Sequence, residues 1–128
     1  MDASFDDREE LLRAVWPPDR RPDFWVNGRL SSAALKDKRG LSVDRTFNRS
    51  LDDAVAFMRT RLQGRIVVLP VSLCLSVQAC LWYRPSAGNA YHSEIHGSET
   101  EIELSDVQAL LLARAAELVF EPDPSYQV

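Results

Sequence analysis

The sequence contains few of the residues from which catalytic and metal-binding motifs are built. It has only two cysteines and two histidines in 128 residues. It has neither a Walker-type glycine pattern, which cradles phosphates, nor a Gly-x-Ser-x-Gly turn, which presents a nucleophilic serine. No residue spacing matches a known catalytic or metal motif. The sequence therefore leaves open whether the protein is an enzyme, and it predicts no cofactor.

Composition places the chain among globular proteins of one domain. Hydrophobic residues make up 45% and charged residues 27%, well away from the composition of disordered chains. The acidic first residues lack a basic segment followed by an apolar stretch, so we do not expect a secretory signal. Cys74 and Cys80 lie in one apolar segment, which is typical of buried intracellular thiols. We therefore expect a cytoplasmic protein in which residues 1–128 form a single α+β domain, with loosely held tails at 1–5 and 122–128.

Charge is distributed unevenly along the chain. The formal net charge is −4, yet basic residues concentrate between positions 19 and 65, and acidic residues predominate on both sides. A basic middle can form a patch for an anionic partner, or it can complement the acidic ends inside one fold. We favour the second interpretation, because an acidic protein is a poor general binder of nucleic acid.

Helix signals occur in several segments. Residues 6–16 open with acidic side chains suited to a helix N-terminus and are followed by two prolines. Ser50 with Asp53, and Ser105 with Gln108, are spaced as helix caps in front of apolar positions with a helical period. The expected helices are 6–16, 32–38, 50–62 and 105–117.

Strand signals lie between these helices. Leu41–Arg45 alternates apolar and polar residues, which is typical of a strand. The run Ile66–Tyr83 carries no charge, but it contains Pro70, serines and a glutamine, and a membrane span needs about 20 predominantly apolar residues. We therefore expect a buried strand near residues 65–72, a second strand near 81–84, and no membrane span.

Together these elements predict an α+β fold. A small mixed or antiparallel sheet is packed by two main helices, 50–62 and 105–117, and by the N-terminal helix. The order of the strands cannot be derived from the sequence. The residues expected in the core are Trp16, Trp25, Phe57, Val67, Leu69, Leu81, Leu110 and Leu111.

Two polar, turn-rich blocks, Asn27–Arg49 and Gly88–Gly97, are the candidate functional segments, because binding sites gather on loops between packed elements. The first block crowds basic residues around two glycines and a short helix, which suits an anionic ligand. His92 and His96 lie in the second block. In a strand they would stand about 13 Å apart, too far to share a metal ion. The candidate binding residues are Arg29, Ser31, Ser32, Arg45, Asn89 and His92, with no metal site.

Four short segments resemble those of small, uncharacterised bacterial proteins. They are a Ser-x-Ala-Leu turn at 32–35, Leu-Ser-Val at 41–43, the apolar strand from Ile66, and Asn-x-x-His at 89–92. The resemblance spans residues 25–115. It implies a bacterial, cytoplasmic protein and makes it more plausible that the two polar blocks meet in space. No catalytic residue carries over, because such proteins have no established activity.

Two functional hypotheses follow from these observations. In the first, the protein is a non-catalytic interaction or accessory module that binds a protein partner through segments 27–49 and 88–97. In the second, it is a small enzyme or ligand-binding domain for an anionic small molecule such as a nucleotide, with Arg29, Arg45 and His92 in one cleft. We prefer the first, because no catalytic triad or metal set can be assembled. Convergence of these side chains on one cavity would favour the second.

Overall fold

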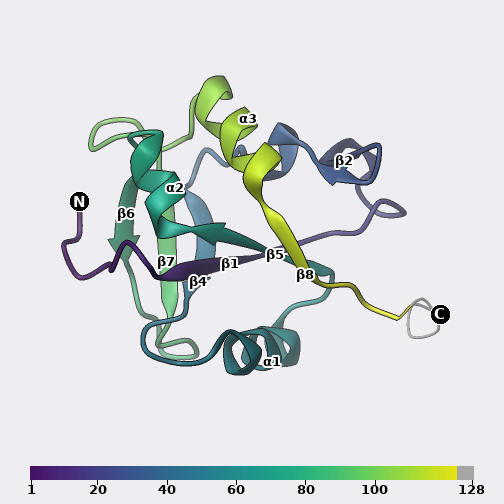
Figure 1. The fold of residues 1–128 in the computed structure, drawn as a ribbon, viewed down its shortest axis with the longest axis horizontal. Coiled ribbons are helices and arrows are strands. Elements are labelled where there is room, and N and C mark those ends of the chain that lie inside the picture. The colour runs from purple at the N-terminus through teal and green to yellow at the C-terminus, as the bar shows by residue number, and fades with distance from the viewer. Residues whose placement is uncertain (124–128) are drawn as a thin grey trace.

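An antiparallel sheet of six strands forms the centre of the computed structural model, which describes residues 1–123 (Figure 1). The strand order is β6-β7-β4-β1-β5-β8, and every neighbouring pair is antiparallel. A separate hairpin joins β2 to β3. This arrangement confirms the expected α+β class with a mostly antiparallel sheet. The strands are β1 Glu10–Val15, β2 Trp25–Val26, β3 Arg29–Leu30, β4 Leu41–Arg45, β5 Arg65–Pro70, β6 Cys80–Tyr83, β7 His92–His96 and β8 Glu117–Phe120.

Helices within residues 1–123 connect these strands. They are α1 Leu51–Arg61, α2 Val71–Ser76, α3 Asp106–Ala115 and the 3-10 helices η1 Pro22–Phe24 and η2 Ser32–Leu35. The two main helices begin where the capping signals predict. The Ser50 hydroxyl accepts the Asp53 N–H at 3.1 Å, and Ser105 with Gln108 forms a reciprocal capping box. In the described part of the chain, no helix has the length and apolar character needed to cross a bilayer.

The prediction of an N-terminal helix over residues 6–16 is wrong, since Glu10–Val15 forms β1 in the interior of the sheet. β1 pairs with β5 along its whole length and with β4 at Leu11 and Leu12. Leu11 faces one side of the sheet and Leu12 the other, and both are fully buried. A strand buried on both faces has adjacent apolar residues, which local spacing does not distinguish from a helix.

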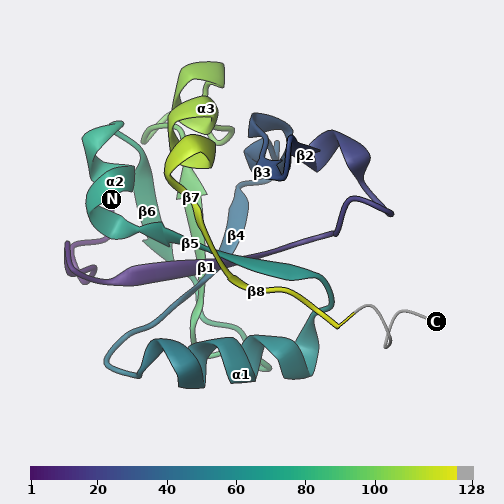
Figure 2. The same ribbon diagram turned by 45° about the vertical axis from the view of Figure 1, so that its right-hand side comes forward.

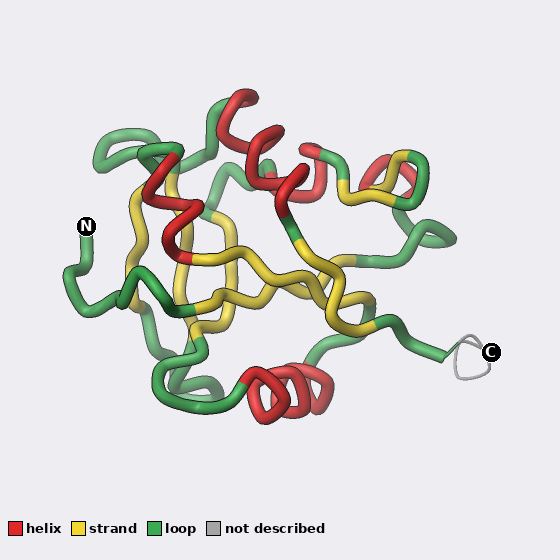
Figure 3. Tube along the Cα trace, viewed as in Figure 1, coloured by secondary structure: helices red, strands yellow, loops and turns green. Residues whose placement is uncertain are grey.

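Alternate residues of the central strands face two cores on opposite sides of the sheet (Figure 2). The larger core contains Leu11 and Val67 and is covered by α2, α3, η2 and the β2-β3 hairpin. The smaller core contains Leu12 and Ile66 and is covered by α1. Figure 3 shows helices on both sides of the strands. The sheet is therefore the middle layer of the molecule.

The expected core is correct in part. Trp25, Val67, Leu69 and Leu81 are buried, and Phe57 is half-buried. The prediction is wrong for Trp16, Leu110 and Leu111, each of which is at least 40% exposed. Helix α3 turns a different set of residues toward the sheet, namely Ala109, Leu112 and Ala113.

The sheet divides between β1 and β4, and this division positions the candidate site. The two strands pair only at Leu11 with Arg45 and Leu12 with Asp44. Beyond Leu12, β1 stays with β5, whereas β4 stays with β7 from Leu41 to Asp44. Figure 2 shows β1 and β5 turning away from β4 and β7. The strands therefore diverge on one side of this short ladder, and side chains from both can enter the opening.

Candidate functional site

A cleft of about 690 Å³ lies where β1 and β4 diverge. Its volume falls within the range typical of small-molecule sites. Residues of β1, of β4, of the end of α1 and of the loop before β7 line it. They are Arg13, Ala14, Val15, Trp16, Phe24, Ser42, Val43, Asp44, Met58, Arg61, Leu62, Gln63, Asn89 and His92. The cleft thus combines polar side chains with an apolar wall.

Asp44 is the buried acidic group of this cleft, with only 3% of the residue exposed. Its carboxylate accepts a hydrogen bond from Asn89 Nδ2 at 2.8 Å and forms an ion pair with the guanidinium of Arg61. Asn89 Oδ1 in turn accepts the Tyr91 N–H at 2.9 Å. A buried charge needs such partners to offset its desolvation. The Asp44 charge is therefore matched, and Arg61 and Asn89 are held in place.

Two arginines bring unused hydrogen-bond donors to the cleft. Arg13 Nη1 spans the opening and donates to the Ser42 carbonyl oxygen at 3.0 Å. The Nε atoms of Arg13 and Arg61 are buried without a partner among the described residues. Burial lowers the pKa of the Arg13 guanidinium, because desolvation penalises its charged form. Buried donors are normally satisfied, so these two side chains have hydrogen-bonding capacity that the described part of the protein does not use.

His92 faces Ser42 across the β4-β7 pair. His92 Nδ1 lies 2.9 Å from the Arg84 carbonyl oxygen, and His92 Nε2 lies 3.4 Å from Ser42 Oγ. Because a carbonyl oxygen only accepts, Nδ1 must carry the proton in the neutral ring. Nε2 is then the acceptor that faces Ser42. The pair could serve as a base and a hydroxyl nucleophile, although 3.4 Å is longer than an ordinary O–H···N hydrogen bond.

Of the sequence-predicted site residues, Asn89 and His92 line this cleft, whereas Arg45 does not. The Arg45 side chain is fully buried. Its guanidinium donates to both carboxylate oxygens of Glu9 at 2.8 Å and to Ser4. The rings of Phe5, Phe47 and Tyr83 pack against it. All three guanidinium nitrogens of Arg45 are engaged inside the protein.

Arg29, Ser31 and Ser32 also lie away from the cleft. Arg29 is an exposed residue of β3. Ser31 Oγ donates to the Asp23 carbonyl oxygen at 2.6 Å and does not cap η2. The expected helix over 32–38 is only the four-residue η2. The structure therefore brings Asn89 and His92 together and places the other predicted residues in two further regions.

Sequence reasoning missed Arg13, Ser42, Asp44 and Arg61 as residues of this cleft. Ser42 and Asp44 alternate with apolar residues in the predicted strand 41–45, so they could have been assigned to one common face. Arg13 was hidden by the wrong helix prediction. No local sequence pattern indicates the residue at which two strands stop pairing.

Neither the thiols nor the second histidine adds reactive chemistry to the cleft. Cys74 is fully buried, and burial raises the pKa of its thiol to about 12, which makes it unreactive at neutral pH. His96 Nε2 pairs with Glu94 at 2.8 Å on the same face of β7. Among residues 1–123, no group of three or more histidine, cysteine or acidic side chains is arranged to hold a metal ion.

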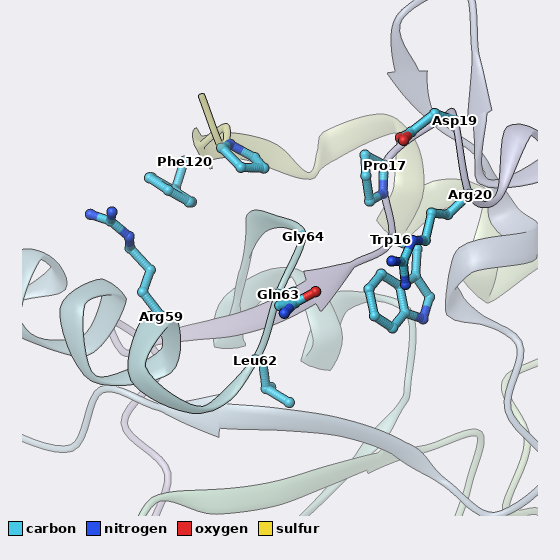
Figure 4. A pocket seen from close by; sticks show the side chains of 10 residues that line it. Trp16, Pro17, Asp19, Arg20, Arg59, Leu62, Gln63, Gly64 and Phe120 are labelled. Atoms are coloured by element: carbon cyan, nitrogen blue, oxygen red, sulfur yellow. The ribbon is translucent and has the colours of Figure 1, made fainter. Parts of the chain in front are cut away.

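A second hollow, of about 270 Å³, adjoins the cleft (Figure 4). Trp16, Leu62 and Gln63 line both hollows. The guanidinium groups of its two arginines already lie over rings, Arg20 over Trp16 at 4.8 Å and Arg59 over the ring of Phe120 at 4.1 Å. The second hollow, which Asp19 and Gln63 also line, is therefore an annex of mixed polar and apolar character. Of the four buried side-chain donors without a partner among residues 1–123, the Arg13 and Arg61 Nε atoms belong to residues of the β1-β4 cleft, which is the candidate site.

Comparison with known proteins adds no assignment. No protein-family model matches the chain, and neither the curated proteins nor the solved structures searched contain a significant match.

Proposed function

We propose that the chain is a binding domain for a small anionic ligand, a carboxylate or a phosphate, held in the β1-β4 cleft. The observation that carries this proposal is the pair Arg13 and Arg61, two arginines that line one cleft and that each have a buried Nε without a hydrogen-bond partner within residues 1–123. Arg61 is ion-paired with Asp44, whereas Arg13 forms no ion pair within residues 1–123 and is influenced only by the more distant charge of Asp37. Guanidinium groups bind carboxylates and phosphates with paired, charge-assisted hydrogen bonds.

Other features of the cleft support an organic anion. Asn89 and His92 supply further polar atoms, and Trp16 and Leu62 form an apolar wall that leads into the annex. Sites with a few convergent polar groups against an apolar wall are typical of small organic ligands. The ligand class agrees with the second hypothesis from the sequence, but Arg13 and Arg61 take the place of Arg29 and Arg45. The resemblance to small bacterial proteins supports a bacterial, cytoplasmic setting.

The test is a thermal-shift titration with inorganic phosphate, succinate and a nucleoside monophosphate. A ligand at a hundredfold excess over its Kd adds about 2.7 kcal/mol, a rise of several degrees in Tm. Arg13→Gln removes hydrogen bonds to a charged group and should weaken binding about 10–100-fold. The matched control is Arg29→Gln, an exposed arginine outside the cleft. We expect it to bind as the wild type does.

Two results would contradict the anion proposal. If Arg29→Gln abolishes binding and Arg13→Gln does not, the ligand occupies the polar block 27–49 instead of the cleft. If none of the three anions shifts Tm at millimolar concentration, the cleft has no appreciable affinity for this ligand class. The protein-partner hypothesis, with contacts through segments 27–49 and 88–97, then becomes the better proposal.

A second candidate function is hydrolysis of an anionic ester, favoured by the contact between Ser42 and His92. Ser42 Oγ would attack the ester carbonyl while His92 Nε2 accepts the hydroxyl proton, and the departing alcohol would take that proton back. Water would then release the acid from Ser42.

The test substrate for this second function is 4-nitrophenyl hemisuccinate, because its free carboxylate can bind Arg13. Ser42→Ala should abolish release of nitrophenol, whereas the control Ser31→Ala should not. Equal rates in wild type and Ser42→Ala would exclude this function.

A further inference from the structure

Helix α3 carries large apolar side chains on its outer side as well as on its inner side. Ala109, Leu112 and Ala113 face the larger core. On the outer side, Val107 is 66% exposed, and Leu110 and Leu111 are each 42% exposed. A surface helix normally has a polar outer face, and a helix that is apolar all round is normally buried. The outer face of α3 therefore has the character of a contact surface.

Leu118 of β8, the strand that follows α3, is a further exposed apolar residue. It stands opposite Val67 in the β5-β8 pair and lines a hollow together with Leu51 and Val55 of α1, so it is separate from the outer face of α3. Leu118 is 42% exposed. Figures 1 and 3 show α3 at the periphery of the molecule, with β8 following directly from its end. Exposed apolar residues gathered on one side of a surface helix, as Val107, Leu110 and Leu111 are on α3, mark interaction sites.

Charges at the two ends of α3 indicate what covers this face. Asp106 is the first residue of the helix and Arg114 is near its last, and Leu110 lies four residues from each. Arg114 is exposed and makes no ion pair with any residue from 1 to 123. An antiparallel copy of the same helix, related by a two-fold axis near Leu110, would place each Asp106 beside the other Arg114. The face is thus complementary to itself.

We propose that the outer face of α3 binds a second copy of this chain and forms a two-fold symmetric dimer. Leu110 meets its counterpart at the axis, and Val107 packs against Leu111 of the other copy. Antiparallel packing also brings the positive end of each helix macrodipole beside the negative end of the other. Asp106 already contacts Lys36 at 2.9 Å, but its side chain is 97% exposed and can also reach a partner.

The dimer is independent of the proposed anion site. Val107, Leu110, Leu111 and the two charged ends of the dimer face are not among the residues that line the β1-β4 cleft. The two surfaces therefore share no residue. Failure of one proposal leaves the other intact.

The first experiment is sedimentation velocity of the full chain across a concentration series. We expect a species of twice the 14.5 kDa chain mass at high concentration. Arg114→Glu places two acidic groups together and should weaken association at least tenfold. Combining it with Asp106→Arg restores opposite charges and should restore the dimer. Thr60→Glu, on the exposed side of α1, is the matched control and should leave association unchanged. Circular dichroism verifies that every variant is folded.

The second experiment locates the axis. Cys74 and Cys80 are buried, so Leu110→Cys introduces the sole exposed thiol among residues 1–123. Mild oxidation should give a disulfide-linked dimer from Leu110→Cys and none from the control Thr60→Cys. A wild-type chain that stays monomeric up to about 1 mM overturns the proposal. A dimer that survives Arg114→Glu and is not cross-linked by Leu110→Cys also overturns it, because another surface then forms the interface.

Discussion

Two arginines show how neighbours decide the role of a single residue. Arg45 has its guanidinium fully enclosed by Glu9, Ser4 and aromatic rings, and every nitrogen has a partner. Arg13 is on the adjacent strand, yet its Nε has no partner and it forms no ion pair within residues 1–123. The first arrangement stabilises the fold. The second leaves a buried donor without a partner, which is the basis of the proposed anion site.

Removal of the Arg45 side chain should therefore be costly. Arg45→Met leaves the Glu9 carboxylate, which is only 7% exposed, buried without its cation. Breaking a buried ion pair in this way costs about 3–5 kcal/mol, because the remaining charge is uncompensated. Urea denaturation should show that loss, and Tm should fall by about 10 °C or more.

Arg29→Met is the control for this prediction, since an exposed arginine contributes at most about 0.5 kcal/mol. A stable Arg45→Met protein that no longer binds anions would reverse the assignment. Arg45 would then contact the ligand, as the sequence analysis proposed.

At the scale of elements, the helices that could be predicted are those with local signals. Ser50 with Asp53 and Ser105 with Gln108 fix the starts of α1 and α3 through contacts three residues apart. Segment 6–16 has acceptable helical spacing, but pairing of β1 with both β4 and β5 decides its structure. Such pairing joins residues far apart in sequence, and the local spacing of apolar residues contains no information about it.

The outer face of α3 was predicted to point inward for a similar reason. Both sides of this helix are apolar, so its period alone does not select the buried side. The small residues Ala109 and Ala113 allow the helix to approach the core closely. The side of α3 that carries them is therefore buried, and the larger Leu110 and Leu111 stay exposed. A helix with two apolar sides is itself a signal that two surfaces will be covered.

The candidate site was predictable only where it lies in a polar block. Asn89 and His92 could be found because polar residues cluster between Gly88 and Gly97. Arg13 and Arg61 could not, since only the fold brings β1 and the end of α1 to the same opening. That opening depends on where the β1-β4 ladder ends. The register describes how two strands pair, so it cannot be read from the sequence of one strand alone.

At the scale of the whole molecule, the two cores share the same strands. In β1, Leu11 belongs to the larger core and Leu12 to the smaller. In β5, Val67 and Ile66 divide in the same way. If the strands of one core separated, the apolar residues of the other core would be exposed as well. This sharing supports the single domain expected from chain length, even though the sheet divides at the β1-β4 junction.

Unfolding should therefore be one cooperative transition. Met58→Ala in the smaller core and Leu112→Ala in the larger core each remove a fully buried side chain, at a cost of about 2–5 kcal/mol. Both should lower the urea midpoint of the same transition without changing its m-value. Tryptophan fluorescence, which reports on Trp16, Trp25 and Trp82 together, should coincide with far-ultraviolet circular dichroism in both variants. If Met58→Ala instead separates the two signals, α1 and its core unfold independently and the sheet does not couple the two layers.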